Sequence, residues 1–257
     1  VSLLRALPAG LLLLAIVRTL PSGIWWPRVF ILGALNFAFF WSLLFLAAYR
    51  LPGGVAATIG AIQPLIVIFL ARALIGSEIR LLSIIAALIG VGGVSLLLLG
   101  PEATLDPIGV MAGLGGAVCM AAGTVLSRKW KPPVSLLTFT AWQLTAGGIL
   151  LIPVALLIEP NFPALTATNI LGLTYLSLIG AALTYVIWFR GIAKIDPSVV
   201  STLGFLSPVT AVILGWAFMN ETLSPLQLAG AATVLFSVLL SQRAANSPTL
   251  TLKPISR

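Results

Sequence analysis

RLPGGVAATIGAIQPLIVIFLARAL, residues 50–74, is matched further along the chain by KIDPSVVSTLGFLSPVTAVILGWAF, residues 194–218. Both stretches are apolar and carry Thr, Gly and Pro at the same spacing. A repeat of this length in membrane-like sequence predicts a duplicated bundle of transmembrane helices. The shared positions are Thr58, Gly60, Pro64, Leu70 and Ala73, which recur as Thr202, Gly204, Pro208, Leu214 and Ala217.

The composition indicates an integral membrane protein. The chain of 257 residues is 60% hydrophobic and only 8% charged, whereas about 25% of the residues in a soluble domain are charged. It contains no His and a single cysteine, Cys119. Intrachain disulfides and a His/Cys metal cluster are therefore excluded, and we expect neither a metal nor another cofactor.

Apolar segments of about 20 residues predict membrane-spanning helices, and turn-rich breaks separate them. The repeat aligns 28–99 with 168–241, and it leaves the helix at 107–127 without a counterpart. We therefore expect an all-α bundle of ten helices, built as two inverted five-helix repeats, whose first helix lies upstream of Val1. The nine helices expected in this chain are near 1–17, 28–49, 53–75, 80–99, 107–127, 134–158, 168–190, 197–219 and 224–241.

These helices predict three regions. Residues 1–99 form the first repeat without its first helix, 107–241 form the second repeat, and 242–257 form a disordered tail. Of the 14 Lys and Arg residues, all but Arg5 and Arg50 fall on alternate connections. By the positive-inside rule those connections and the C-terminus are cytoplasmic. The net charge of +8 is thus an orientation signal and does not indicate a nucleic-acid partner.

Matching motifs recur near the ends of both repeats. They are Leu206-Ser207-Pro208-Val209 and Asn220-Glu221-Thr222-Leu223, with Gln63-Pro64-Leu65 and Gly76-Ser77-Glu78 in the first repeat. These motifs resemble the EamA family of the drug/metabolite transporter superfamily. The resemblance implies ten helices in two inverted repeats and a multi-pass transporter of the inner membrane. Within the superfamily the sequence most resembles bacterial exporters of amino acids, including the aromatic amino acid branch.

Two mid-span prolines are candidate gating residues. Pro64 and Pro208 each remove a backbone donor and free a carbonyl, which is tolerated in lipid where neighbours or a water-filled cavity satisfy it. We expect kinked, cavity-lining helices that bend during transport. The alternative is a static kink.

Polar and aromatic residues at membrane depth are candidates for substrate binding. Together they would form a pocket with aromatic walls and a few hydrogen-bonding groups, suited to a zwitterion with a large side chain. The alternatives are aromatic rings that face lipid and hydroxyls that bond their own helix. The candidates are Asn36, Phe40, Trp41, Gln63, Trp142, Tyr185, Trp188, Ser201 and Ser207.

Arg5 is a further candidate, because it is the one cation expected within the apolar layer. It could pair bidentately with a substrate carboxylate. Alternatively, it could extend to the outer interface, as long basic side chains do. No Asp, Glu, Lys or His lies in the middle of a span, and Glu78 and Glu221 are placed to cap helices.

These residues favour an alternating-access transporter that exports amino acids and related metabolites, or facilitates their passage. The alternatives are a transporter of phosphorylated sugars or other metabolites and a proton antiporter using a group on the absent helix. An intramembrane enzyme is disfavoured because no nucleophile–base pair is available, and a non-transporting scaffold leaves the paired prolines unexplained. The expected partners are a small-molecule substrate and the lipid bilayer, and a monomer is possible.

Overall fold

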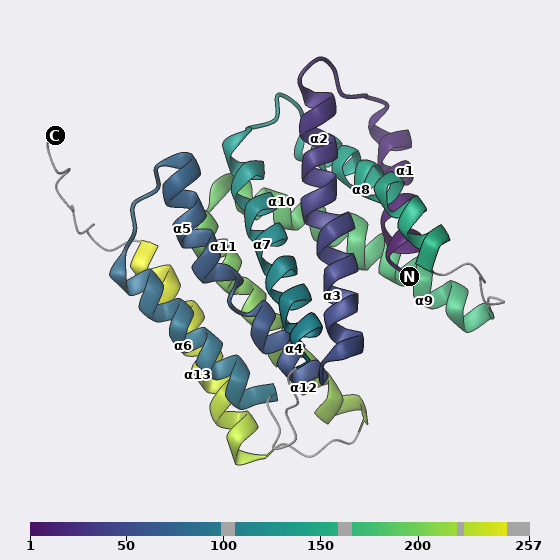
Figure 1. Ribbon diagram of the computed structural model, residues 1–257. Helices are drawn as coiled ribbons and strands as arrows, with labels where there is room; N and C mark the ends of the chain where they lie inside the picture. The colour runs from purple at the N-terminus through teal and green to yellow at the C-terminus, as the bar shows by residue number, and fades with distance from the viewer. Residues whose placement is uncertain (99–105, 159–165, 220–223, 246–257) are drawn as a thin grey trace, which may run out of the picture. The chain divides into compact units, whose positions relative to one another are not determined.

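The computed structural model describes residues 1–98, 106–158, 166–219 and 224–245, and within these ranges every regular element is a helix (Figure 1). Eight helices in the described part are long and apolar enough to cross a membrane, and the shorter apolar helix Ser2–Val17 makes a ninth. The predicted all-α membrane fold is confirmed, with helices where the sequence placed them.

Several of these spans consist of two or three consecutive helical segments. The bounds are α1 Ser2–Val17, α2 Trp25–Gly33, η1 Ala34–Ala38, α3 Phe39–Arg50, α4 Gly53–Gly60, α5 Gln63–Ile75, α6 Leu81–Leu98, α7 Pro107–Lys129, α8 Leu136–Ile158, α9 Ala167–Ser177, η2 Leu178–Leu183, α10 Thr184–Lys194, α11 Pro197–Thr202, η3 Leu203–Phe205, α12 Leu206–Met219 and α13 Pro225–Ala245.

The helices form two compact units. Unit 1 comprises 1–45 and 122–194, and unit 2 comprises 46–121 and 195–257. Each unit therefore takes helices from both predicted repeats. In unit 1, α1 packs along α8, its expected counterpart. The contact is close because Gly10 has no side chain: a Cβ there would lie 2.5 Å from the backbone nitrogen of Thr145.

Unit 2 is built around a second pair of expected counterparts, α6 and α13. A Cβ on Gly230 would lie 2.6 Å from the backbone nitrogen of Leu97, so the two backbones approach directly. Small residues permit such contacts between membrane helices, where dispersion forces replace the hydrophobic effect. Val94, Phe205 and Val234 belong to the buried cluster beside this contact.

Two spans of unit 1 contain π-helical segments, and these lie at matching positions of the predicted repeat. The segment η1 spans Ala34–Ala38 and η2 spans Leu178–Leu183, in the register that aligns Trp41 with Tyr185. A π segment changes the local hydrogen-bond pattern and is frequent at functional sites. Segment η1 carries Asn36, which bonds Gln143 of α8, and η2 carries the Gly180 carbonyl, which bonds Arg5 of α1.

Two spans of unit 2 change helix geometry at the predicted gating prolines. The first has a turn at Ala61 and Ile62, both with right-handed helical dihedral angles, between α4 and α5, and Pro64 lies in the first turn of α5. The second passes without a gap through the 3-10 turn Leu203–Phe205 into α12, where Pro208 lies in the first turn. Each span therefore stays helical and is locally irregular just before its proline, which lacks a backbone donor.

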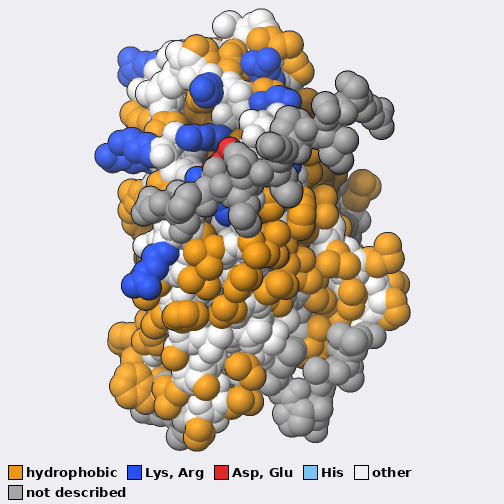
Figure 2. Space-filling model, turned by 90° about the vertical axis from the view of Figure 1, so that its left-hand side faces the viewer, with side chains coloured by type: hydrophobic (Ala, Val, Ile, Leu, Met, Phe, Trp, Pro, Cys, Tyr) orange, Lys and Arg blue, Asp and Glu red, His pale blue; other side chains and the backbone are white. Residues whose placement is uncertain are grey.

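The C-terminal helix α13 continues to Ala245, past the predicted start of the tail at Gln242. The rest of that tail, 246–257, lies outside the described residues, as does Glu221. Large hydrophobic side chains are exposed on both units, among them Tyr49 and Leu157. The face drawn in Figure 2 is mostly hydrophobic, with Lys and Arg side chains gathered toward one end.

Candidate functional site

Arg5 of α1 is held in unit 1 by a backbone carbonyl and an aromatic ring. Its Nη2 donates to the carbonyl oxygen of Gly180 at 2.7 Å, and its guanidinium carbon lies 4.7 Å from the centroid of the Trp41 ring. Gly180 belongs to η2, so the π segment supplies the acceptor. The buried Nε of Arg5 has no hydrogen-bond partner among the described residues.

A buried aromatic group adjoins Arg5. The ring centroid of Trp41 lies 5.4 Å from that of Phe37 and 6.2 Å from that of Tyr185. The ring centroids of Phe37 and Tyr185 are 4.6 Å apart. The sequence predicted Trp41 and Tyr185 as site residues, and the structure brings them together. It places Phe37, not the half-buried Phe40, beside them. Phe37 is four residues from Trp41, but Asn36 and Phe40 have the same spacing, so spacing alone did not identify Phe37 as the partner.

The aromatic contacts continue through unit 1. Tyr185 lies 6.0 Å from Phe189, which lies 5.5 Å from Phe139. Phe189, four residues after Tyr185, takes the inward position that the sequence assigned to Trp188, which is half-buried. The predicted site residue Trp142 lies at the far end of this series, because the ring centroid of Trp25 is 6.1 Å from that of Phe139 and 6.3 Å from that of Trp142. The indole Nε1 of Trp142 donates to the carbonyl oxygen of Thr19 at 2.6 Å.

Asn36 forms a buried amide network on η1. Its Nδ2 donates to Oε1 of Gln143 at 2.8 Å and approaches Oγ of Ser127 at 3.5 Å. Asn36 is 1% exposed and Gln143 is fully buried. Nε2 of Gln143 and Oγ1 of Thr124 have no partner among the described residues. The predicted site residue Asn36 thus joins η1 to α7 and α8.

Carboxylates are absent from the described part of unit 1. Four of its basic side chains bind carbonyl oxygens or lie over rings: Arg5, Arg18, Arg28 and Arg128. Arg128, for example, donates to the carbonyls of Ile192 and Ala193 near the end of α10. The other basic residues in this part are Lys129, Lys131, Arg190 and Lys194.

Unit 2 contains a cavity of about 190 Å³ at the two irregular turns before Pro64 and Pro208. Gln63 lines it, and Nε2 of Gln63 has no partner among the described residues. Ser201 also lines it, with its hydroxyl donating to the Ser198 carbonyl at 2.9 Å, whereas Ser207 is exposed and is not part of the lining. Four pairs of wall residues correspond in the predicted repeat: Ala57 with Ser201, Gly60 with Gly204, Ala61 with Phe205, and Pro64 with Pro208.

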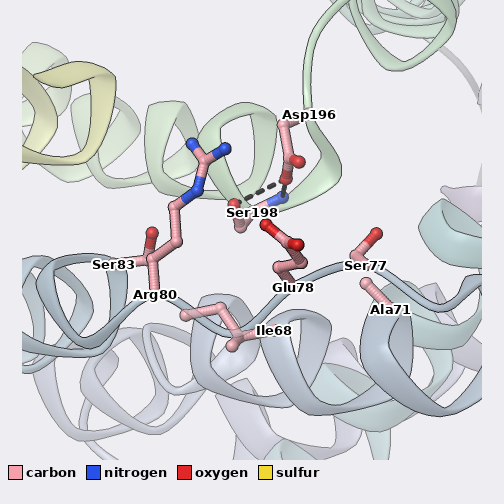
Figure 3. A pocket seen from close by; sticks show the side chains of 8 residues that line it. All are labelled: Ile68, Ala71, Ser77, Glu78, Arg80, Ser83, Asp196 and Ser198. Carbon is pink, nitrogen blue, oxygen red and sulfur yellow. Dashed lines mark hydrogen bonds between the residues drawn. The ribbon is translucent and has the colours of Figure 1, made fainter. Parts of the chain in front are cut away.

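A smaller cavity of about 100 Å³ lies where α5, α6 and α11 meet (Figure 3). The Glu78 side chain extends toward Asp196 and Ser198. Asp196 caps α11, accepting from the backbone nitrogen of Ser198 at 2.9 Å. Glu78 precedes α6 and does not cap it as predicted, because the carbonyl of Arg80 accepts the first helical bonds. Arg80 itself donates to the Ala244 carbonyl at 2.8 Å, joining α6 to α13.

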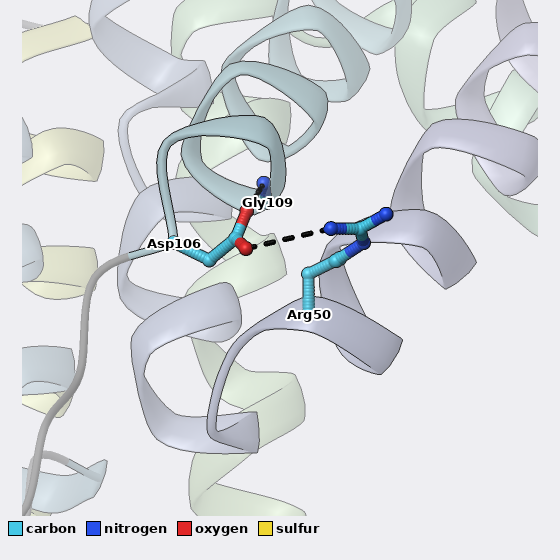
Figure 4. A network of polar contacts seen from close by, with 3 residues as sticks. All are labelled: Arg50, Asp106 and Gly109. Atoms are coloured by element: carbon cyan, nitrogen blue, oxygen red, sulfur yellow. Dashed lines mark hydrogen bonds and ion pairs between the residues drawn. The ribbon is translucent and has the colours of Figure 1, made fainter.

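Asp106 and Arg50 form an ion pair in unit 2, with 3.5 Å between Oδ2 and Nη1 (Figure 4). Asp106 precedes α7, and its Oδ1 accepts from the backbone nitrogen of Gly109 at 2.8 Å. The Gly109 N–H and then the positive charge of Arg50 lower the pKa of Asp106 from its ordinary value. Both side chains are partly exposed, so the ion pair adds little to the free energy of unfolding, and its main effect is to position the two helix ends.

Comparison with known proteins assigns the chain to a family. The EamA-like transporter family matches residues 1–99 and 107–242. Protein PecM of Dickeya dadantii is 43% identical over 94% of this chain and 82% of its own length. The WAT1-related protein At3g02690 of Arabidopsis thaliana is 33% identical over 93% of this chain and 61% of its own.

More distant similarities agree. The uncharacterized inner membrane transporter YedA of Escherichia coli is 27% identical over 92% of this chain and 78% of its own. A crystal structure with 20% sequence identity superposes with a TM-score of 0.82 over 95% of this chain and 87% of that one, which shows the same fold. Both the matched family and YedA are named as transporters. The chain belongs to the EamA-like transporter family and is a multi-pass membrane transporter of small metabolites.

Proposed function

We propose that this protein moves amino acids, with aromatic or other large neutral side chains, across the cell membrane by alternating access. The observation that carries the proposal is Arg5. It lies against a buried aromatic group in a unit whose described part has no carboxylate. A fixed cation matches the carboxylate of such a substrate, and the aromatic rings beside it match a large side chain.

The carboxylate of the substrate is the anion proposed for Arg5. The Gly180 carbonyl and the Trp41 ring hold the guanidinium while Nε is left without a protein partner. Guanidinium binds carboxylate through paired, charge-assisted hydrogen bonds. Buried in the protein, such a cation costs free energy unless a partner compensates it, and a substrate that carries the anion would do so.

The aromatic group supplies a reason for preferring large side chains. Trp41 and Tyr185 are 3% and 8% exposed, so the rings are packed and offer defined faces. Aromatic rings interact favourably edge to face with one another. A substrate ring could extend the same arrangement, whereas a small polar side chain gains nothing from it.

The irregular turns in the spans of unit 2 support the gating proposal. Pro64 and Pro208 border one cavity, and each lies in the first turn of an α-helix that follows a local change of helix geometry. Irregular helical spans line the binding and gating regions of many secondary transporters. Nε2 of Gln63, unpartnered at the same place, would donate to a carbonyl or carboxylate of the passing substrate.

Facilitated transport is the proposed mechanism, because the candidate residues include no titratable acid or His. The test is flux of labelled amino acids into liposomes, measured with and without a pH gradient. We expect flux of aromatic amino acids down their own gradient. Accumulation driven by the pH gradient would replace facilitation with proton coupling, and flux of sugar phosphates alone would overturn the substrate class.

Variants test the site directly. Trp41→Ala and Pro208→Ala should each lower flux by about tenfold, since misplacement of substrate or gate by about an ångström has effects of this size or larger, while folded protein is retained. Matched controls are Trp216→Ala, whose ring is 56% exposed, and Pro153→Ala, inside the unbroken helix α8. Normal flux from both well-folded test variants would contradict the assignment.

A further inference from the structure

A second arginine of unit 1, Arg28, lies over two tryptophan rings. Its guanidinium carbon is 5.2 Å from the centroid of Trp25 and 5.4 Å from that of Trp130. Trp25 and Arg28 belong to the first turn of α2, and Trp130 follows α7. The three side chains thus join the start of one span to the end of another.

The N–H groups of Arg28 have no hydrogen-bond or ion-pair partner in the described part of the chain. Contact with ring faces uses none of its five donors. The described part of unit 1 also has no Asp or Glu that could reach it. A helix N-terminus disfavours a cation and favours an anion, so an anion bound to Arg28 would be stabilised by the first turn of α2 as well as by the guanidinium.

We propose that Arg28 binds the phosphate of an anionic phospholipid headgroup. Guanidinium presents a planar set of donors that matches phosphate oxygens, and the N-terminus of α2 adds to the local positive potential. Other cations lie close in the sequence to residues of this group. Lys129 and Lys131 flank Trp130 in the sequence. Arg18 precedes Thr19, whose carbonyl oxygen accepts a hydrogen bond from Trp142, and the Trp142 ring centroid lies 6.3 Å from that of Trp25.

The position in the membrane identifies a lipid, and not free phosphate, as the ligand. The candidate span begins at Trp25, so Arg28 lies where a span emerges from the hydrocarbon. Trp side chains favour this interface, and basic pockets between helices at this depth bind anionic headgroups. The positive-inside prediction assigns this end to the cytoplasmic leaflet, where anionic lipids are common.

The test is native mass spectrometry of the full chain released from vesicles of phosphatidylglycerol and phosphatidylcholine. We expect wild type to retain phosphatidylglycerol preferentially. Arg28→Gln should reduce that preference by about fivefold, the effect of one basic residue near a charged membrane surface. Arg28→Lys should give an intermediate value, because lysine keeps the charge without the planar donor set.

Arg72→Gln is the matched control, because Arg72 is exposed on another connection predicted to be cytoplasmic and belongs to unit 2. It should retain the wild-type preference. An unchanged preference in Arg28→Gln, or an equal loss in Arg72→Gln, would overturn the site.

A second measurement does not depend on the folding of the Arg28 variants. In wild type, phosphatidylglycerol with brominated chains should quench tryptophan fluorescence more than brominated phosphatidylcholine does, and Trp130→Phe should reduce the difference. Equal quenching by the two lipids contradicts the proposal. Added inorganic phosphate should leave the difference unchanged, and its abolition by phosphate would assign the site to the free ion.

Discussion

The two units of this transporter neutralise their charges in different ways. In its described residues unit 2 contains Glu78, Asp106 and Asp196, and Arg50 is paired with one of them. The described part of unit 1 has basic residues and no acid, so its arginines use carbonyl oxygens and aromatic rings. Among the described residues, unit 2 therefore pairs charges internally, whereas unit 1 places its arginines against carbonyl dipoles and ring faces.

The units also differ in how the geometry of their spans changes. Unit 1 has π segments at η1 and η2, whereas unit 2 has a tight turn before Pro64 and a 3-10 turn before Pro208. A π segment holds more residues per turn than an α-helix, and a 3-10 turn holds fewer. The two units thus change the direction of their side chains by opposite local changes in helix winding.

The largest expected effect is the loss of substrate binding in Arg5→Gln. A charge-assisted hydrogen bond contributes about 1.5–3 kcal/mol, so the KM for amino acid flux should rise roughly ten- to hundredfold. Arg190→Gln is the matched control, because Arg190 is an exposed cation of the same unit. An unchanged KM in Arg5→Gln would show that the substrate carboxylate does not bind at Arg5.

A smaller effect is expected when the amide network of unit 1 is disrupted. Asn36→Leu and Gln143→Leu should each lower the free energy of unfolding by about 1–3 kcal/mol, because each leaves a buried amide unpaired. The double variant should lose less than the sum of the two. Chemical unfolding in detergent measures all three.

Gln63→Leu in unit 2 is the comparison for this series, since Nε2 of Gln63 already lacks a partner. Its unfolding free energy should change by less than about 0.5 kcal/mol. A loss as large as that of Asn36→Leu would remove the distinction between a structural amide in unit 1 and a ligand-directed amide in unit 2.

The smallest effect concerns the ion pair of unit 2. Folding lowers the pKa of Asp106, so its stabilising contribution is present above the ordinary Asp value of 3.8 and is lost as the pH falls through the folded value below it. Asp106→Asn should therefore melt slightly below wild type at neutral pH, and the difference should disappear in acid. Thermal unfolding across this pH range would show it, and a difference that grows in acid would contradict the sign.

Side-chain partners were the part of the site that the sequence predicted least well. Trp41 and Tyr185 were identified because they correspond in the repeat, and they do meet. The third ring is Phe37, although the sequence favoured Phe40 as the residue sharing a face with Asn36. A π segment holds more residues per turn than an α-helix, so a face projected from an ideal α-helix through η1 is misplaced.

The prolines show what recurrence can predict. Their matched positions predicted kinked, cavity-lining helices at Pro64 and Pro208, and both residues line the cavity beside a local change of helix geometry. The sequence proposed both Gln63 and Ser207 for the site, but only Gln63 lines the cavity, because lining depends on how each segment is rotated.

The sequence by itself determined the membrane location, the number and extent of the spans, and the proline positions where two of them become irregular. These properties are local, because hydropathy and proline stereochemistry act along one helix at a time. Tertiary structure decided which groups meet: Arg5 with Gly180, Asn36 with Gln143, and Arg28 with its two indoles. Such contacts depend on helix rotation and on close packing at residues like Gly10, where neighbouring helices, and not the local sequence, fix the final geometry.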